Sequence, residues 1–307
     1  MRAVVTVAPR QMQLQDVPPP DAPVAGEALV RVEAVGLCGS DLHLFSGDHP
    51  YSHFPNRQGH EFGGIVEAIG PGYTGPARVG DRVAVEPLRG CGTCFACRRN
   101  RPNCCVRIEV LGAQVPGALA DRVTVPASTL YPVGDLSPEL AALVEPISIG
   151  YWAVVRGAVA ADDTVVVFGA GPIGQAILLA CVDRDARVLV VDRLPARLDL
   201  ARTLGAAMTV DVTREQASHA VAGWTDGDGP SIVFDATGVP AVVRSAIDVV
   251  APAGRVVIVG LSNEDLCVPL VEFTRKELTV LGSRNSTGIF GQAVDLVRRR
   301  RDGAERL

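Results

Sequence analysis

The pattern of hydrophobic and polar positions changes near residue 150. Before that point, short runs rich in β-branched residues are interrupted by Gly and Pro, and no long helical periodicity lies between them. Such runs include AVVTV from Ala3, ALVRVEAVG from Ala28 and GGIVEAIG from Gly63. The pattern predicts a closed antiparallel β domain over residues 1–150.

From Thr164 onward, strands and helices alternate. The strand-like runs are TVVVF, RVLVVD, MTVDV, SIVFDAT, RVVIVG and ELTVLGS, and helical segments begin near Pro172, Pro195 and Ala241. Alternation of this kind implies right-handed crossovers between parallel strands. We therefore expect an α/β domain over residues 151–285, built on a doubly wound parallel sheet of the Rossmann type.

A glycine motif follows the first strand of this second half. Gly169, Gly171 and Gly174 stand in G-x-G-x-x-G order, and Asp192 ends the next strand 18 residues after Gly174. Such glycines allow a tight turn and close approach of a pyrophosphate, while the helix N-terminus offers free N–H groups. Three glycines alone also fit an ordinary strand-to-helix turn, but the strand before and the helix after them favour a dinucleotide site.

The acid at the end of the second strand favours NAD over NADP. A carboxylate at Asp192 accepts hydrogen bonds from ribose hydroxyls and repels a 2′-phosphate. Arg193 is either a surface residue or a partner for that phosphate, so NADP stays possible. Arg197, one helical turn on, is placed to lie beside the adenine.

Four cysteines at Cys91, Cys94, Cys97 and Cys105 have gaps of two, two and seven residues. Such spacing predicts a tetrahedral zinc site, and a shell made only of thiolates leaves no open position, so this ion is expected to be structural. Cys104 is an alternative fourth ligand. Two disulfides are the other interpretation, which the absence of a secretory signal disfavours.

Composition sets the remaining limits. A chain of 307 residues that is 48% hydrophobic and 21% charged can bury a large core in two domains. The net charge of -5 argues against a nucleic-acid partner. The longest nearly uncharged stretch, Thr164–Val182, contains glycines and a proline and fits a strand, turn and helix better than a membrane span. We expect a cytoplasmic protein.

A second set of metal-binding residue types is dispersed along the chain. Cys38 lies in GLCGSDLH, and His60 and Glu61 follow Gly59. Alone, the cysteine would be a packing residue and the His-Glu pair a surface feature. Together, sulfur, nitrogen and oxygen ligands leave room for water or substrate, as a catalytic zinc requires.

These motifs resemble those of the zinc-dependent medium-chain alcohol dehydrogenase superfamily, in its sorbitol, threonine and sugar-acid dehydrogenase branch. The motifs that carry the resemblance are GLCGSDLH, GHEFGGIVEAIG, GDRVAVEP, the four-cysteine loop, ALVEPISIG, VVVFGAGPIG and KELTVLGSRN. The resemblance implies that residues 1–150 form a GroES-like catalytic domain, with a structural zinc lobe at about 88–107. It also implies an oxidoreductase that moves hydride from a secondary alcohol to NAD.

The resemblance assigns roles to particular residues. Cys38, His60 and Glu61 would hold a catalytic zinc, with Glu145 as a fourth ligand or one water away, giving two zinc ions per chain. Zinc would lower the pKa of the substrate hydroxyl, and Ser40 and His43 would relay its proton. Further cofactor contacts are implied for a set of residues near the glycine motif and at later strand ends: Ile173, Gly260, Leu261, Ser262, Ser283 and Arg284.

The chain differs from the family that it resembles at its C-terminus. Relatives continue beyond the position of Leu307, so residues 286–307 are expected to be a shortened form of the family's last segment. The alternative to an active enzyme is therefore an inactive or regulatory NAD-binding paralogue. The substrate is expected to be a polyol, a sugar acid or a hydroxy amino acid, and the assembly a homodimer or homotetramer.

Overall fold

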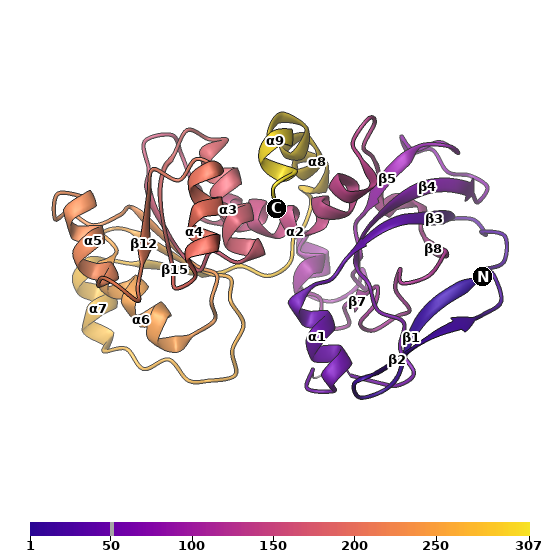
Figure 1. The fold of residues 1–307 in the computed structure, drawn as a ribbon, viewed down its shortest axis with the longest axis horizontal. Helices are drawn as coiled ribbons and strands as arrows, with labels where there is room; N and C mark the ends of the chain where they lie inside the picture. The colour runs from indigo at the N-terminus through magenta and orange to yellow at the C-terminus, as the bar shows by residue number, and fades with distance from the viewer. Residues whose placement is uncertain (50–51) are drawn as a thin grey trace. The chain divides into compact units, whose positions relative to one another are not determined.

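The computed structural model describes residues 1–49 and 52–307, which fold into two compact units (Figure 1). The first unit comprises Met1–Glu145 and Phe290–Arg298, and the second comprises Pro146–Ile289 and Arg299–Leu307. The division falls inside helix α2 (Pro138–Arg156). Among the described helices, none has both the length and the apolar character needed to cross a membrane.

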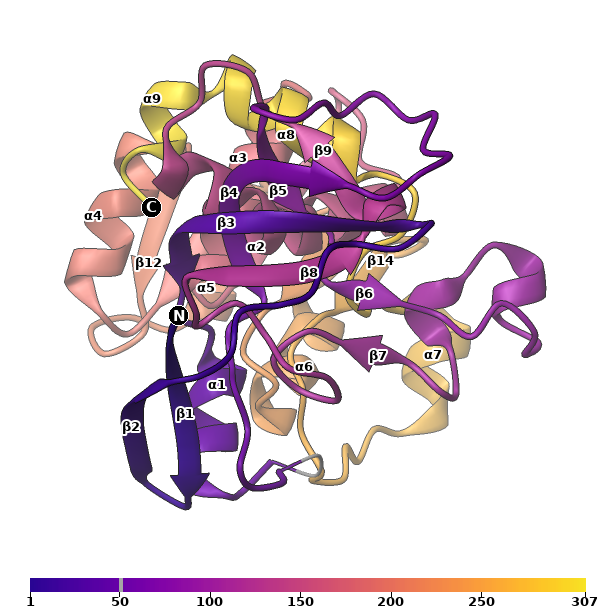
Figure 2. The same ribbon diagram turned by 90° about the vertical axis from the view of Figure 1, so that its right-hand side faces the viewer.

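An antiparallel sheet forms the centre of the first unit. Its strands follow the order β8-β3-β4-β5-β9, and Figure 2 shows β8, β3 and β4 as neighbours. Their bounds are β3 Glu27–Gly36, β4 Glu61–Ile69, β5 Arg82–Val85, β8 Arg122–Pro126 and β9 Leu130–Pro132. Because side chains alternate between faces, Val30, Phe62 and Val83 enter one shared core. The predicted antiparallel β fold is confirmed.

Shorter elements surround this sheet. A hairpin of β1 and β2 lies at the N-terminus, where the Val4 N–H donates to the Leu119 carbonyl at 2.8 Å and ties β1 to a distant loop. The remaining elements of the first unit are β1 Arg2–Ala8, β2 Gln11–Asp16, α1 Gly39–Ser46, β6 Leu88–Arg89, β7 Glu109–Val110 and the 3₁₀ turns Cys97–Arg99, Pro102–Cys104 and Ala127–Thr129.

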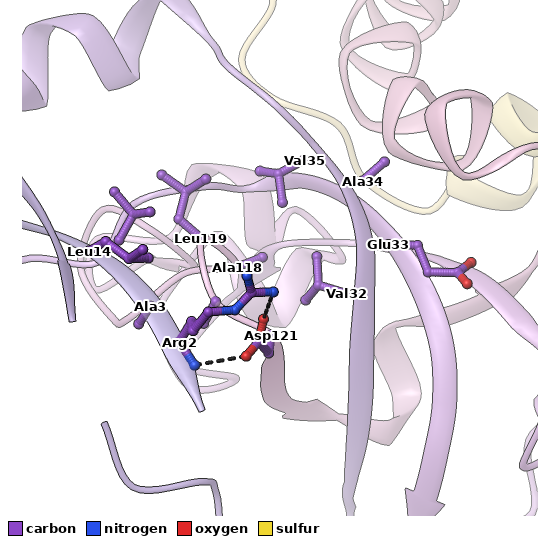
Figure 3. Close-up of a pocket in the computed structure, with 12 residues that line it drawn as sticks. Arg2, Ala3, Leu14, Val32, Glu33, Ala34, Val35, Ala118, Leu119 and Asp121 are labelled. Carbon is purple, nitrogen blue, oxygen red and sulfur yellow. Dashed lines mark hydrogen bonds and ion pairs between the residues drawn. The ribbon is translucent and has the colours of Figure 1, made fainter. Parts of the chain in front are cut away.

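A cavity of about 270 Å³ lies between β1, β3 and the loop at 118–121. Its lining is mostly apolar, and Figure 3 shows the Arg2 guanidinium pairing with the Asp121 carboxylate, at 3.1 Å. The other carboxylate of the lining, Glu33, is also paired, with Arg31 at 3.3 Å and with Arg82 at 2.9 Å, so arginines neutralise both acidic groups. This cavity is therefore a packing feature of the hairpin.

The second unit is built on a parallel sheet in the order β12-β11-β10-β13-β14-β15. Its strands are β10 Thr164–Phe168, β11 Arg187–Asp192, β12 Met208–Asp211, β13 Ile232–Asp235, β14 Arg255–Ile258 and β15 Thr279–Gly282. Strand order reverses on the two sides of β10, as in a doubly wound Rossmann sheet. The predicted parallel sheet is confirmed.

Helices cover this sheet because its strands are apolar on both faces. Val166 and Leu189 share a core with residues of α5 and α6. Val165 and Val167 point the opposite way, and the almost wholly buried helix α3 packs against β10 and β11. The helices are α3 Pro172–Val182, α4 Pro195–Thr203, α5 Ala217–Trp224, α6 Pro240–Val249, α7 Leu270–Lys276 and α9 Arg301–Ala304.

The last long helix, α8 (Phe290–Arg299), packs mainly in the first unit. The Phe290 ring lies 4.8 Å from the ring of Tyr131 in β9, measured between centroids. Arg298 donates to the Pro132 carbonyl of the same strand at 3.3 Å. The C-terminal segment therefore covers the β9 edge of the antiparallel sheet.

A partly buried ion pair, between Asp163 and Arg255, connects the amino ends of three strands in the second unit. The Asp163 carboxylate accepts hydrogen bonds from Arg255 at 2.6 Å, from the Ser231 hydroxyl at 2.7 Å and from the Ala160 N–H at 2.8 Å. Asp163→Asn leaves Arg255 without its charge partner, so we expect a loss of about 2–4 kcal/mol in urea unfolding. The exposed pair of Asp199 with Arg202 is the control, and Asp199→Asn should cost under about 0.5 kcal/mol. Equal losses in both variants would contradict this expectation.

Candidate functional site

A cluster of mixed ligand types lies where β3 ends and β4 begins. β3 and β4 are antiparallel, with Gly36 opposite Glu61, so Cys38 just after β3 meets His60 and Glu61 at the start of β4. One ligand atom from each of these three residues lies within 4.8 Å of the others. The structure thus brings together Cys38, His60 and Glu61, called the mixed cluster below.

Sterics at Gly36 help to place the Glu61 carboxylate. A Cβ atom at this position would collide with Glu61 Oε2. Gly36 therefore leaves room for the carboxylate in its present position, and a side chain there would make the flexible end of Glu61 move. This explains locally why glycine precedes the Leu-Cys segment.

The donor set of the mixed cluster fits zinc. A thiol, an imidazole and a carboxylate are the three ligand types that zinc takes in proteins. His60 is buried, and its Nδ1 atom has no hydrogen-bond partner. Burial raises the pKa of the Cys38 thiol and of the Glu61 carboxyl, and a bound cation would reverse both effects.

Glu145 lies in α2, outside the mixed cluster. Burial raises the pKa of its carboxyl to about 8, an effect that His60 opposes and that Glu61 and Cys38 reinforce. The electrostatic interaction places Glu145 near the cluster without bringing its oxygens into the 4.8 Å group. A role as ligand or as partner of a bound water therefore stays a prediction.

The two residues expected to relay a proton lie in α1. Ser40, in the first turn, is hydrogen-bonded to the Cys38 thiol, which counteracts the burial that raises the thiol pKa. His43 lies in the last turn and is exposed to solvent. Ser40 beside the cluster and His43 at the surface are thus in the order that a proton relay to solvent requires. The relay itself stays a prediction.

The second cluster contains four thiols. Cys91, Cys94, Cys97 and Cys105 place their sulfur atoms within 4.8 Å of one another. Cys105 is buried, and its sulfur accepts hydrogen bonds from the N–H groups of Cys91 at 3.3 Å and Arg107 at 3.2 Å. Cys104 is exposed and lies outside the group, so the loop brings Cys105 to the fourth position.

The electrostatics of the four-cysteine cluster also suit a cation. A hydrogen bond from Arg107 lowers the pKa of Cys91 to about 5, and backbone N–H groups lower the pKa of Cys94. Burial raises the pKa of Cys97 to about 11. Without a cation, the four thiols cannot all be ionised, whereas zinc would hold all four as thiolates.

In the second unit, a cavity of about 1190 Å³ opens at the carboxyl ends of the parallel strands. Gly169, Gly171, Asp192, Arg193 and Arg197 are among the residues that line it. This is the end at which Rossmann sheets bind dinucleotides. We call it the strand-end cavity.

The glycine turn at this cavity has specific steric requirements. Gly169 has a φ of +92°, a conformation that L side chains rarely adopt. A Cβ at Gly174 would collide with the Gly169 carbonyl oxygen, so the third glycine permits the helix to start directly beside the turn. Ile173 lies in the first turn of that helix.

Asp192 is held by the backbone. Its Oδ2 accepts from the Ala170 N–H at 2.6 Å, and its Oδ1 accepts from the N–H groups of Arg193 at 2.7 Å and Leu194 at 2.9 Å. Arg197 lies 3.8 Å from Oδ2. The carboxylate is thus fixed at the end of β11 with part of its acceptor capacity left for a ligand.

The residues that line the strand-end cavity differ in part from those that the sequence predicts. Thr237 and Arg214 line the strand-end cavity but were not predicted as site residues, although Thr237 is the last residue of the fourth strand-like run, SIVFDAT. Ser283 is buried with an unpaired hydroxyl, and Arg284 is exposed. Five residues that were predicted to contact the cofactor are not part of the lining of this cavity: Gly260, Leu261, Ser262, Ser283 and Arg284.

Comparisons with known proteins agree with these sites. Family models match residues 24–135, as an alcohol dehydrogenase GroES-like domain, and residues 172–299, as a zinc-binding dehydrogenase. The starvation-sensing protein RspB of Escherichia coli K12 is 33% identical over 96% of this chain and 87% of its own. L-Galactonate-5-dehydrogenase of the same organism is 34% identical over 87% of this chain and 79% of its own.

A solved structure gives the same result. The short-chain alcohol dehydrogenase RspB of E. coli CFT073, in complex with NADH, superposes with a TM-score of 0.90 at 32% identity, over 100% of this chain and 90% of that one. The fold and the two thiol-containing clusters define a metal-dependent dehydrogenase. The chain belongs to the zinc-dependent medium-chain alcohol dehydrogenase family, whose members are oxidoreductases that use NAD or NADP.

Proposed function

We propose that the chain oxidises a secondary alcohol of a polyol, a sugar acid or a hydroxy amino acid, with NAD as acceptor. The observation that carries this proposal is the mixed cluster of Cys38, His60 and Glu61. A shell of three different ligand types leaves a coordination position for substrate, whereas the four-cysteine cluster is closed. A sugar-acid relative of similar sequence supports the substrate class.

The residues divide the chemistry between them. When bound, zinc supplies a Lewis acid and NAD supplies a hydride acceptor. Cys38, His60 and Glu61 hold the metal, with Glu145 as a fourth ligand or one water away. Ser40 takes the proton of the substrate hydroxyl, and His43 passes it to solvent, to which its ring is exposed.

The carboxylate at Glu145 supports a substrate with two neighbouring oxygens. A shell with a second carboxylate is harder than one with a second thiolate, and its coordination adapts more easily. Polyols, sugar acids and hydroxy amino acids all carry a second polar group beside the reacting carbon. This property favours them over simple alcohols.

The strand-end cavity supports NAD as the acceptor. Asp192 still has acceptor capacity for a ribose hydroxyl, and its charge disfavours a 2′-phosphate. Gly169, Gly171, Ile173 and Gly174 would adjoin the pyrophosphate. The later strand ends would approach the nicotinamide, through Gly260, Leu261, Ser262, Ser283 and Arg284.

An oligomer built through the second unit is part of this proposal. β15 pairs with β14 and ends the described sheet on that side. In the same unit, Leu261, Leu270 and Val271 expose large apolar side chains, at 91%, 82% and 55%. A homodimer or homotetramer would cover them, and eight unpaired cysteines suit the reducing cytoplasm.

Metal analysis and a substrate panel test the proposed function together. Freshly purified protein should contain two zinc ions per chain and should reduce NAD with at least one polyol, sugar acid or L-threonine, faster than it reduces NADP. One zinc ion or none would overturn the proposed catalytic site. Binding of NAD without turnover on the whole panel would identify an inactive paralogue.

A further inference from the structure

A chain of buried polar side chains lies behind the mixed cluster. Thr6 in β1, Gln58 before β4 and Asp41 in α1 are exposed by only 1%, 1% and 3%. Polar groups buried to this degree in an apolar core are destabilising unless they are hydrogen-bonded. The three come from segments more than 15 residues apart, and their partners lead toward the metal ligands.

Gln58 connects the other two residues. The Thr6 hydroxyl donates to Gln58 Oε1 at 2.7 Å. Gln58 Nε2 donates to the Asp41 carbonyl at 2.6 Å and lies 3.5 Å from Asp41 Oδ1. A carbonyl only accepts, so a flipped amide would set two acceptors against each other. The orientation of the Gln58 amide is therefore fixed by its partners.

Asp41 in turn contacts two of the three residues of the mixed cluster. Its Oδ2 accepts from the Cys38 N–H at 3.0 Å, which fixes the start of α1. Its Oδ1 lies 3.7 Å from His60 Nδ1, the ring atom that has no hydrogen-bond partner. The carboxylate thus faces one nitrogen of the imidazole and leaves the other for a metal.

We propose that Gln58 and Thr6 are positioning residues for the metal ligands, acting through Asp41. The Gln58 amide fixes the Asp41 backbone and carboxylate, and the carboxylate orients the His60 ring and selects the tautomer with a proton on Nδ1. The inference rests on the proposed function, because it takes the mixed cluster to be the catalytic zinc site. Outer partners of this kind change metal affinity by about 10- to 100-fold.

A purely structural role makes a different prediction. If the Thr6 to Gln58 bond only ties β1 to the sheet, its loss lowers the melting temperature and leaves metal affinity unchanged. The four-cysteine cluster is an internal reference, because it would hold a second ion in the same molecule, far from these contacts in sequence. A selective loss of one ion therefore indicates positioning.

The experiment measures zinc release from the holoenzyme to a chromophoric chelator, together with kcat. Gln58→Leu should release one zinc ion about tenfold more readily, while the second ion is released as in the wild type. Gln175→Leu is the matched control. Gln175 is another buried glutamine, which donates to the Ala170 and Arg197 carbonyls in the second unit, so its loss should lower stability and leave both ions in place.

A second pair of variants keeps the test independent of the folding of Gln58→Leu. Thr6→Val removes the hydroxyl at nearly constant side-chain shape and should weaken the binding of one zinc ion. Thr6→Ser keeps the hydroxyl donor and should bind both ions as the wild type does. If the wild type holds two zinc ions and both variants, Gln58→Leu and Thr6→Val, release zinc as the wild type does, the positioning role is overturned. The proposed function is then unaffected. A wild type with a single ion would overturn the proposed function and this inference with it.

Discussion

His60→Ala is expected to remove one of the two zinc ions and to reduce kcat/KM by at least about 10³-fold. Lewis-acid stabilisation by a metal is worth several kcal/mol, and each 1.36 kcal/mol corresponds to a factor of ten. His60 also supplies the nitrogen donor of the mixed cluster, and Cys38 and Glu61 alone leave two acidic groups whose pKa burial already raises. Elemental analysis and NAD reduction measure the two effects.

The control for this variant is His219→Ala. His219 lines the strand-end cavity in the second unit, so its loss should leave both zinc ions in place. Thermal unfolding of His60→Ala should also show that the chain stays folded, because His60 belongs to neither of the two hydrophobic cores. Two zinc ions in His60→Ala would contradict the assignment of the mixed cluster.

The fold was predictable because its signals are local. Strand-like runs separated by Gly and Pro indicate a β domain, and alternating runs with intervening helices indicate a parallel sheet, without knowledge of distant contacts. The structure confirms both sheets. Gly169 and Gly174 were also predictable, since their steric roles concern residues five positions apart.

The polar chain behind the mixed cluster was not predictable in the same way. Thr6 stands in an apolar strand run, AVVTV, where threonine is an ordinary strand residue. Gln58 precedes the Gly-His-Glu motif by one position and has no periodicity with it. Their hydrogen bond joins residues 52 positions apart, so only the tertiary structure reveals that both are buried.

The environment of Asp192 was only partly predictable from the sequence. An acid at the end of the second strand predicts a ribose contact, but the three backbone N–H groups that hold the carboxylate depend on the geometry of the glycine turn. The sequence likewise left open whether Cys104 or Cys105 is the fourth thiol of the cluster. N–H groups from both ends of the loop converge on the Cys105 sulfur, which favours Cys105 as the fourth ligand, and only the tertiary structure shows this.

Cys97→Ser is expected to remove the other zinc ion and to unfold the lobe around residues 88–107 while the mixed cluster keeps its metal. Short zinc-bound loops owe most of their stability to the metal, with apparent binding free energies of about 10–16 kcal/mol in zinc-finger peptides. In this lobe the described regular structure is limited to the two-residue strand β6, which pairs with β7 just beyond the lobe, and two 3₁₀ turns. Without zinc, few backbone contacts would hold it.

Limited proteolysis detects this unfolding, because Arg98 and Arg99 offer trypsin sites within the loop, whereas the Arg101–Pro102 bond resists trypsin. Cleavage there should be rapid in Cys97→Ser and slow in the wild type, and the zinc content should fall from two ions to one. Cys104→Ser is the matched control, since Cys104 is exposed and outside the cluster, and it should keep both ions and resist trypsin. Loss of zinc from Cys104→Ser instead would show that Cys104 is the fourth ligand, because the two adjacent thiols cannot both occupy one position of a tetrahedral shell.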